Sequence, residues 1–287
     1  MVDSTDPRDR GEVVARLRGG RQVIGTWNPL AAPAVAEVVA AAGFDVVLLD
    51  LEHGEFGTGA LPDLLRAVEV AGAAALVRVR TSDQLGPALD AGAAGVLLPN
   101  VQSVEEVEAA VAACRYAPRG ERGAAPMVRD VRYGHRCFVD HHREAAPLVG
   151  VQVEGPQVLE VLDEVLSVEG LDLVFVGPHD LSQRLGVPGE VSHPDVVAAI
   201  EDVATRCRAA GVATGVWSPD AATAQLWLDV GIGLVTVTST TILLAEATQE
   251  LVAALRGVAP DPDVADRASH DSAPNWAEGE SGRSFLA

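Results

Sequence analysis

Five side chains suited to proton transfer, anion binding or metal binding stand at the ends of short apolar runs of this sequence: Asp50, His53, Arg78, Glu154 and Asp180. A carboxylate beside an imidazole fixes the tautomer of the ring, which titrates near neutral pH. Asp50 and His53, so close in the chain, therefore suggest an orienting acid and a general acid/base. The alternative interpretation is a histidine that only caps a loop.

Glu154 and Asp180 each follow an apolar run, and two hard carboxylates at neighbouring strand ends favour Mg²⁺ or Mn²⁺. Water and substrate would fill the remaining coordination positions. The alternative to a metal site is a structural role, in which Glu154 would pair with an arginine and Asp180 would cap the next turn. Arg78 suits a carbonyl or carboxylate oxygen because its guanidinium is a planar fork. A buried ion pair of Arg78 with Glu52 or Glu154 is compatible with that role.

The composition excludes several classes of function. All 21 basic residues are arginine. Schiff-base chemistry, with or without pyridoxal phosphate, needs a lysine amine, and a P-loop needs its lysine. The net charge of −20 makes nucleic acid and anionic membranes poor partners. The three cysteines follow no disulfide or zinc spacing, and the charged N-terminal residues do not resemble a secretory signal. No apolar run approaches the roughly 20 residues of a membrane span, so we expect a cytoplasmic protein.

The elements that must position these residues alternate along the chain. Apolar runs rich in Val and Leu are followed by stretches with helical spacing, such as 33–42, 104–114, 193–210 and 221–230. The runs predicted as strands are 23–27, 46–50, 75–79, 95–99, 148–154, 173–177, 212–217 and 234–238. About eight strand–helix units predict an α/β chain folded as a (β/α)₈ TIM barrel. An open doubly wound sheet is the competitor, but no GxGxxG follows the first strand.

We divide the 287 residues into an N-terminal extension (1–20), a barrel (21–257) and a tail (258–287). The tail, rich in Pro, Asp, Ser and Gly, is expected to be flexible or to serve as an arm of an oligomer. The stretch 115–147 interrupts the strand–helix rhythm and is predicted to be a long loop with a short helix. Its arginines could meet an acidic substrate, although such a run is more often a solvated face or a subunit contact.

The ordered motifs resemble the pyruvate-dependent, metal-requiring class II aldolases of the HpcH/HpaI family. The matching stretches are Gly25-Thr26-Trp27, Ala42-Gly43-Phe44-Asp45, Leu49-Asp50-Leu51-Glu52-His53, Val77-Arg78, Arg119-Gly120-Glu121-Arg122-Gly123, Gln152-Val153-Glu154 and Gly177-Pro178-His179-Asp180-Leu181-Ser182. They run in the family's order over most of the chain. The resemblance implies a barrel of the phosphoenolpyruvate/pyruvate type, commonly a homohexamer whose last helix is exchanged between paired subunits.

The resemblance also implies roles. Glu154 and Asp180 would bind Mg²⁺, Mn²⁺ or Co²⁺, while His53, oriented by Asp50, would be the acid/base. Arg78 would hold the keto oxygen of pyruvate. Substrate contacts are further expected from Gln152, Gly177, Pro178 and Ala125, partly through main-chain amides that follow Gly123 and Gly177.

The implied reaction is reversible cleavage of a 4-hydroxy-2-oxo acid to pyruvate, or a related 2-oxo acid, and an aldehyde. Without lysine the chain cannot form an imine, so a metal and Arg78 would stabilise the enolate electrostatically. Departures at Ala124-Ala125-Pro126 and His179 bear on the substrate more than on the reaction class, because a proline has no N–H to donate.

Two other functions are weighed. One is a C–C lyase for acyl-CoA substrates, of the citrate lyase and malyl-CoA lyase type, whose CoA phosphate the Arg-rich loop would receive. The other is a barrel that binds an oxo acid or a partner protein without turnover.

Overall fold

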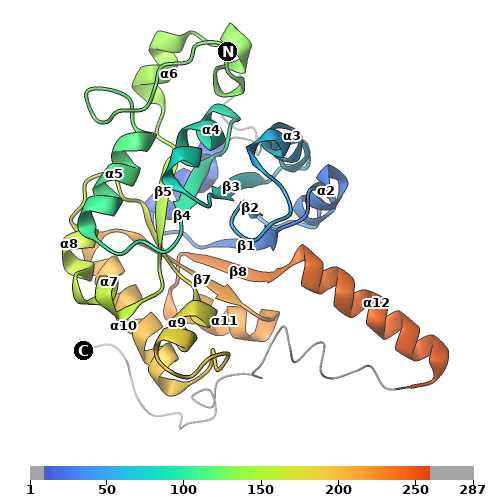
Figure 1. Ribbon diagram of the computed structural model, residues 1–287. Helices are drawn as coiled ribbons and strands as arrows, with labels where there is room; N and C mark the ends of the chain where they lie inside the picture. Colours follow the sequence, from blue (N-terminus) through green and yellow to red (C-terminus); the bar gives the residue numbers. More distant parts are fainter. Residues whose placement is uncertain (1–9, 259–287) are drawn as a thin grey trace.

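Residues 10–258, described by a computed structural model, form a closed barrel in which each strand pairs in parallel with the next and β8 pairs with β1 (Figure 1). The strands are β1 (Val23–Asn28), β2 (Val46–Asp50), β3 (Ala74–Arg78), β4 (Gly95–Leu98), β5 (Leu148–Val153), β6 (Leu173–Val176), β7 (Ala213–Ser218) and β8 (Leu234–Ser239). The predicted (β/α)₈ barrel is confirmed, and each predicted strand overlaps an observed one.

Helices alternate with the strands. The α-helices are α1 (Arg10–Arg18), α2 (Pro33–Ala41), α3 (Leu61–Val70), α4 (Leu85–Asp90), α5 (Val104–Cys114), α6 (Phe138–Glu144), α7 (Pro156–Glu160), α8 (Leu162–Leu166), α9 (Pro178–Arg184), α10 (Pro194–Ala210), α11 (Ala221–Val230) and α12 (Thr240–Arg256). The 3₁₀ helices are η1 (Thr58–Ala60), η2 (Ser82–Gln84) and η3 (Arg129–Gly134). Helix α12 projects away from the barrel (Figure 1).

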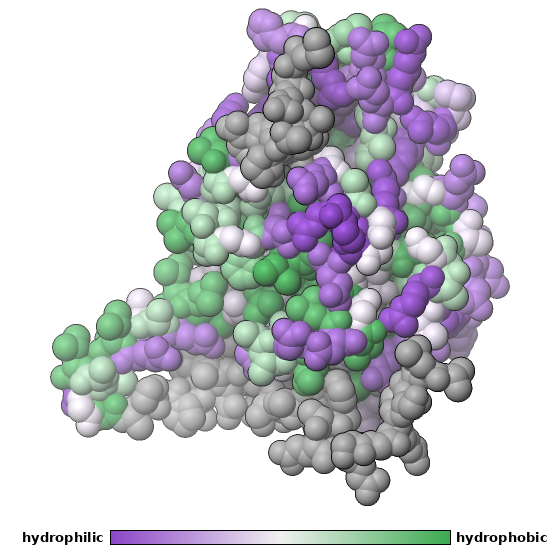
Figure 2. Space-filling view, turned by 180° about the vertical axis from the view of Figure 1, so that it is seen from behind, coloured by the Kyte–Doolittle hydropathy of each residue, from purple (hydrophilic) through white to green (hydrophobic). Residues whose placement is uncertain are grey.

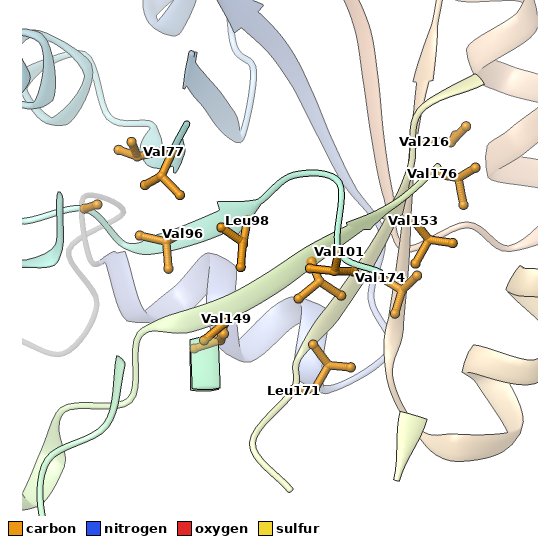
Figure 3. Packing of buried hydrophobic residues seen from close by; sticks show 14 of the residues in the cluster. Val77, Val96, Leu98, Val101, Val149, Val153, Leu171, Val174, Val176 and Val216 are labelled. Atoms are coloured by element: carbon orange, nitrogen blue, oxygen red, sulfur yellow. The ribbon is translucent and has the colours of Figure 1, made fainter. Parts of the chain in front are cut away.

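Side chains alternate between two cores because successive residues of a strand point to opposite faces. In β3, Val77 belongs to the layer between strands and helices (Figure 3), while Leu76 lies inside the barrel. In β2, Leu48 belongs to the interior core as well. Continuing the alternation by two residues places Asp50 and Arg78 at the upper end of the interior.

Small residues make room for large ones inside the barrel. A Cβ at Gly215 of β7 would lie 2.5 Å from Cδ2 of Phe175, which is 1% exposed. The Trp27 ring and this phenyl ring pack in a T-shaped arrangement, with centroids 5.5 Å apart and an interplanar angle of 84°. These aromatic rings form the floor beneath the polar strand ends.

The predicted domain boundary at residue 20 separates α1 from the barrel, yet Val13, Val14 and Leu17 are buried in the interior cluster with Val23. Residues 10–18 therefore pack as part of the barrel. The predictions for residues 1–9 and for most of the tail, 259–287, concern residues outside the described range. Between residues 10 and 258, no helix is long and apolar enough to cross a membrane.

Candidate active site

A pocket of about 560 Å³ opens where the carboxyl ends of the strands meet, as is usual for barrel enzymes. It gathers seven predicted site residues from separate strand ends. Those residues are Asp50, His53, Arg78, Gln152, Gly177, Pro178 and Asp180.

Arg78 is the central contact of this polar cluster. Its Nε and Nη2 donate to the two carboxylate oxygens of Asp50 at 2.9 and 2.7 Å, and Nη1 lies 3.0 Å from Oε2 of Glu52. Nη1 also donates to Oε1 of Gln152 at 3.4 Å. The pairing follows from the register, because Asp50 and Arg78 are direct partners on β2 and β3. The predicted ion pair with Glu52 is present, and Asp50 is an additional partner.

Trp27 supports the guanidinium from one side, with Cζ of Arg78 lying 4.5 Å from the ring centroid. Such a cation–π contact is favourable when the pair is desolvated, and Arg78 is 8% exposed. The fork is thus held in place before any substrate binds.

His53 is oriented by Asp50 through the main chain, not through its ring. Oδ1 of Asp50 accepts from the amides of Glu52 and His53 at 3.0 and 3.4 Å. Nε2 of the imidazole lies 3.8 Å from Oε2 of Glu52, and the ring is 70% exposed at the pocket. The expected carboxylate–imidazole pair is therefore corrected: Glu52 is the nearer carboxylate. Burial raises the pKa of Glu52, and the Arg78 guanidinium opposes that rise.

Glu154 and Asp180 converge around Gly177. A Cβ at that glycine would lie 2.8 Å from Nε2 of Gln152, 3.5 Å from Oδ2 of Asp180 and 3.6 Å from Cγ of Glu154. Glu154 is 6% exposed. Burial, followed by the negative charges of Asp180 and Glu52, raises its pKa to about 7.

This carboxylate pair fits a hard divalent cation. Burial and like charge disfavour ionisation of Glu154, and a bound cation would relieve both. Within residues 10–258, no group of three or more His, Cys, Asp or Glu side chains is arranged to hold a metal. Two carboxylates suit an ion that keeps water and substrate as its other ligands, as Mg²⁺ commonly does.

Ala125 is not among the residues that line this pocket. It lies on the segment that joins α5 to β5, which contacts the opposite end of the barrel: Nη1 of Arg115 donates to the carbonyl of Pro147, just before β5. Nη1 of Arg129 likewise donates to the carbonyl of Ala91, ahead of β4. A substrate contact of Ala125 stays a prediction, because Ala125 does not line the pocket of its own chain.

Four arginines of that segment form ion pairs with carboxylates: Arg115, Arg122, Arg129 and Arg136. Arg115 pairs with Asp172 at 3.1 Å, and Arg122 pairs with Asp90 at 2.9 Å. The stretch 115–147 also contains η3 and α6, so the predicted long loop with a short helix is confirmed.

Several lining residues were not predicted as part of the site. Trp27 and Phe175 form its floor, while Ser239 and Thr241 lie at its rim where α12 begins. Alternation along β1 and β6 could have found the two aromatic rings, because both follow inward-facing residues. Ser239 and Thr241 carried no comparable signal.

A closed parallel barrel with a buried arginine, an exposed imidazole and the Glu154–Asp180 carboxylate pair at its carboxyl end is the usual architecture of a barrel enzyme. Residues 23–247 match the family model described as HpcH/HpaI aldolase/citrate lyase. The chain belongs to this family, as the resemblance predicted.

Individual relatives agree with that membership. A hydroxypyruvate/pyruvate aldolase of Pseudomonas aeruginosa is 38% identical over 87% of this chain and 94% of its own length. A 4-hydroxy-2-oxo-heptane-1,7-dioate aldolase of Salmonella newport is 38% identical over 83% of this chain and 91% of its own. The crystal structure of an HpcH/HpaI aldolase/citrate lyase family protein from Burkholderia cenocepacia superposes with a TM-score of 0.80 at 33% identity, covering 85% of this chain and 99% of that one.

Proposed function

We propose that the protein is a divalent-metal-dependent aldolase that reversibly cleaves a 4-hydroxy-2-oxo acid to pyruvate, or a related 2-oxo acid, and an aldehyde. The observation that carries the proposal is the convergence of Glu154 and Asp180 beside the fixed guanidinium of Arg78. The chain belongs to a family in which similar proteins are named pyruvate aldolases, and this supports pyruvate as the donor substrate.

Glu154 and Asp180 would hold the metal, Mg²⁺, Mn²⁺ or Co²⁺, which would supply a Lewis acid for the oxygens of the 2-oxo acid. Arg78 would donate to the keto oxygen as negative charge develops there. Because Asp50 and Trp27 fix the guanidinium in advance, little reorganisation accompanies the reaction.

His53 is the side chain available for proton transfer. In cleavage, its imidazole would take the proton of the 4-hydroxyl group, directly or through one water. The electron pair of the C3–C4 bond would then pass to the pyruvate portion, which becomes an enolate as the aldehyde leaves. Protonation at C3 gives the methyl group of pyruvate, and addition runs through the same steps in reverse.

The direct test is pyruvate release from a 4-hydroxy-2-oxo acid, followed with lactate dehydrogenase. We expect release to stop with EDTA, to return with Mg²⁺, Mn²⁺ or Co²⁺, and to be lost in His53→Ala. Full turnover in EDTA or in Glu154→Ala would contradict the metal assignment.

The acyl-CoA lyase alternative is less well supported. It assigned the CoA phosphate to the Arg-rich segment, but that segment contacts the opposite end of the barrel with Arg115 and Arg122 held by carboxylates. The non-catalytic alternative is disfavoured by the joint presence of Arg78, His53 and both carboxylates in one site.

We further propose that the chain forms a homo-oligomer through α12. Leu244, Leu251 and Leu255 of this helix are 50%, 65% and 88% exposed, and Figure 2 shows apolar side chains along the projecting arm. Exposed apolar side chains on one helix are typical of a surface that another chain covers. The hexamer implied by the resemblance remains a prediction.

A further inference from the structure

Thr236 of β8 is a fully buried polar residue that none of the roles proposed for the site uses. It is not among the residues that line the pocket. Its Oγ1 accepts a hydrogen bond from Nε1 of Trp27 at 2.8 Å and donates one to the carbonyl of Val216 at 3.1 Å. A hydroxyl has one proton to donate, so the bond to β7 fixes its direction and leaves a lone pair for the indole N–H. The hydroxyl therefore ties β1 to β7 inside the barrel.

The contact lies where the pairing of β1 with β8 becomes irregular. Gly25 pairs with Thr236, but Trp27, two residues further on, pairs with Ser239, so β8 holds one extra residue over this step. Thr238, within that step, has a φ of +52°, which is unfavourable for a β-branched residue. A bulge of this kind bends a strand and can redirect a side chain. The displaced ladder carries the hydrogen bond of the single N–H on the Trp27 ring.

The Trp27 ring transmits this constraint to Arg78. Asp50 binds Nε and Nη2 of the guanidinium, and the group could still tilt about that edge. The indole lies against it, with Cζ of Arg78 4.5 Å from the ring centroid, and limits the tilt on one side. Nη1, which does not bind Asp50, would move most if the ring moved. The position of this donor therefore depends on what holds the indole in place.

We infer that Thr236 is a positioning residue: its hydroxyl sets the angle of the Trp27 ring and, through that ring, the position of the Arg78 guanidinium. The inference rests on the proposed aldolase function, in which Arg78 meets the keto oxygen. Without the hydroxyl, the indole N–H would be a buried donor with no acceptor, and that cost favours movement of the ring. A residue outside the pocket would then govern how well the pocket stabilises an enolate.

The test compares Thr236→Val, which keeps the shape of the side chain and removes its hydroxyl, with Thr236→Ser, which keeps the hydroxyl. Exchange of pyruvate methyl protons with D₂O in the presence of Mg²⁺ is followed by NMR. We expect Thr236→Val to lower kcat for exchange by about 10-fold and to change KM for pyruvate by less than about 2-fold, because a displaced guanidinium matters most as charge develops. Thr236→Ser should recover most of the rate.

Thr26→Val is the matched control. Thr26 is an equally buried threonine on β1, but its Oγ1 has no hydrogen-bond partner within the described part of the chain. Removal of this hydroxyl should leave exchange unchanged, so a loss confined to Thr236→Val reports the contact with the indole and not the loss of a buried hydroxyl.

A double-mutant cycle separates this route from a general loosening of the barrel. Trp27→Phe has no ring N–H, so Thr236→Val should slow exchange little further in that background. General loosening would lower the rate by the same factor in both backgrounds. Binding of oxalate with Mg²⁺, measured by calorimetry, gives a readout without turnover. Oxalate resembles the planar enolate, and its Kd should rise by about 10-fold in Thr236→Val and stay near the wild-type value in Thr236→Ser.

The inference and the function on which it rests fail in different ways. If the wild type exchanges and Thr236→Val keeps the wild-type kcat, or loses the same factor in the Trp27→Phe background, the inference is wrong and the aldolase assignment stands. If the wild type binds oxalate but does not exchange, the aldolase assignment fails, and the Kd of Thr236→Val still decides the positioning role. If the wild type neither exchanges nor binds oxalate, both are overturned.

Discussion

Glu154→Gln should stabilise the metal-free protein at mildly alkaline pH, although it removes a proposed metal ligand. Burial and the neighbouring carboxylates raise the pKa of Glu154 from 4.5 to about 7. The folded chain therefore keeps a proton that the unfolded chain loses between these values, and stability falls as pH rises through that window. Glutamine has the same shape and no charge, so the variant avoids this loss.

The magnitude follows from the two pKa values. Their difference is about 2.5, and each pKa unit corresponds to about 1.4 kcal/mol, so ionised Glu154 weakens the folded state by about 3 kcal/mol. For a chain of this size that is a rise in Tm of roughly 6–12 °C for the variant at about pH 8. Well below pH 4.5 the advantage should vanish, because both states then hold the proton.

The assay is thermal or urea unfolding in EDTA at several pH values, with Glu160→Gln as a control for loss of one exposed carboxylate on α7. Saturating Mn²⁺ should reverse the order, because the wild type gains binding free energy that the variant cannot. A variant that is less stable than the wild type in EDTA at about pH 8 would refute the reasoning that burial and like charge destabilise ionised Glu154.

Three further predictions concern other parts of the molecule. Gly177→Ala should lower kcat/KM at least about 10-fold by displacing the Gln152 amide, 2.8 Å from the new Cβ, while a normal circular dichroism spectrum would show that the fold is kept. Gly215→Ala should cost about 1–3 kcal/mol in urea unfolding, because its Cβ would lie 2.5 Å from the ring of Phe175; an unchanged midpoint would contradict the packing. Leu251→Glu should shift the mass measured by light scattering towards the monomer, and an unchanged mass would argue against α12 as the subunit contact.

Much of the barrel was predictable because its strands are buried on both faces and read as continuous apolar runs. Those runs also located Asp50 and Arg78, since a residue that ends a barrel strand lies at the site. Their direct pairing was less accessible, because it depends on the register between β2 and β3, which hydrophobicity does not encode. The sequence likewise could not show that Asp50 orients His53 through its amide.

The role of the segment 115–147 could not be decided from the sequence. Its arginines stand out in the sequence, and their number left open a substrate contact, a solvated face or a subunit contact. In the structure Arg115 and Arg122 are 8% and 7% exposed and bind Asp172 and Asp90 at the far end of the barrel. Which carboxylate meets which arginine depends on long-range contacts, so charge clustering alone could not separate a structural role from a binding one.

The most direct test of the central claim is the exchange of pyruvate methyl protons in D₂O, followed by NMR with Mg²⁺ and with a matched EDTA control. Mn²⁺ can replace Mg²⁺ if EDTA is added before the spectrum is read. The account predicts exchange that requires the metal and is lost in both Glu154→Gln and Arg78→Met. Exchange that continues in EDTA or in Arg78→Met, or no exchange with Mg²⁺, Mn²⁺ or Co²⁺, would contradict formation of a pyruvate enolate at this site.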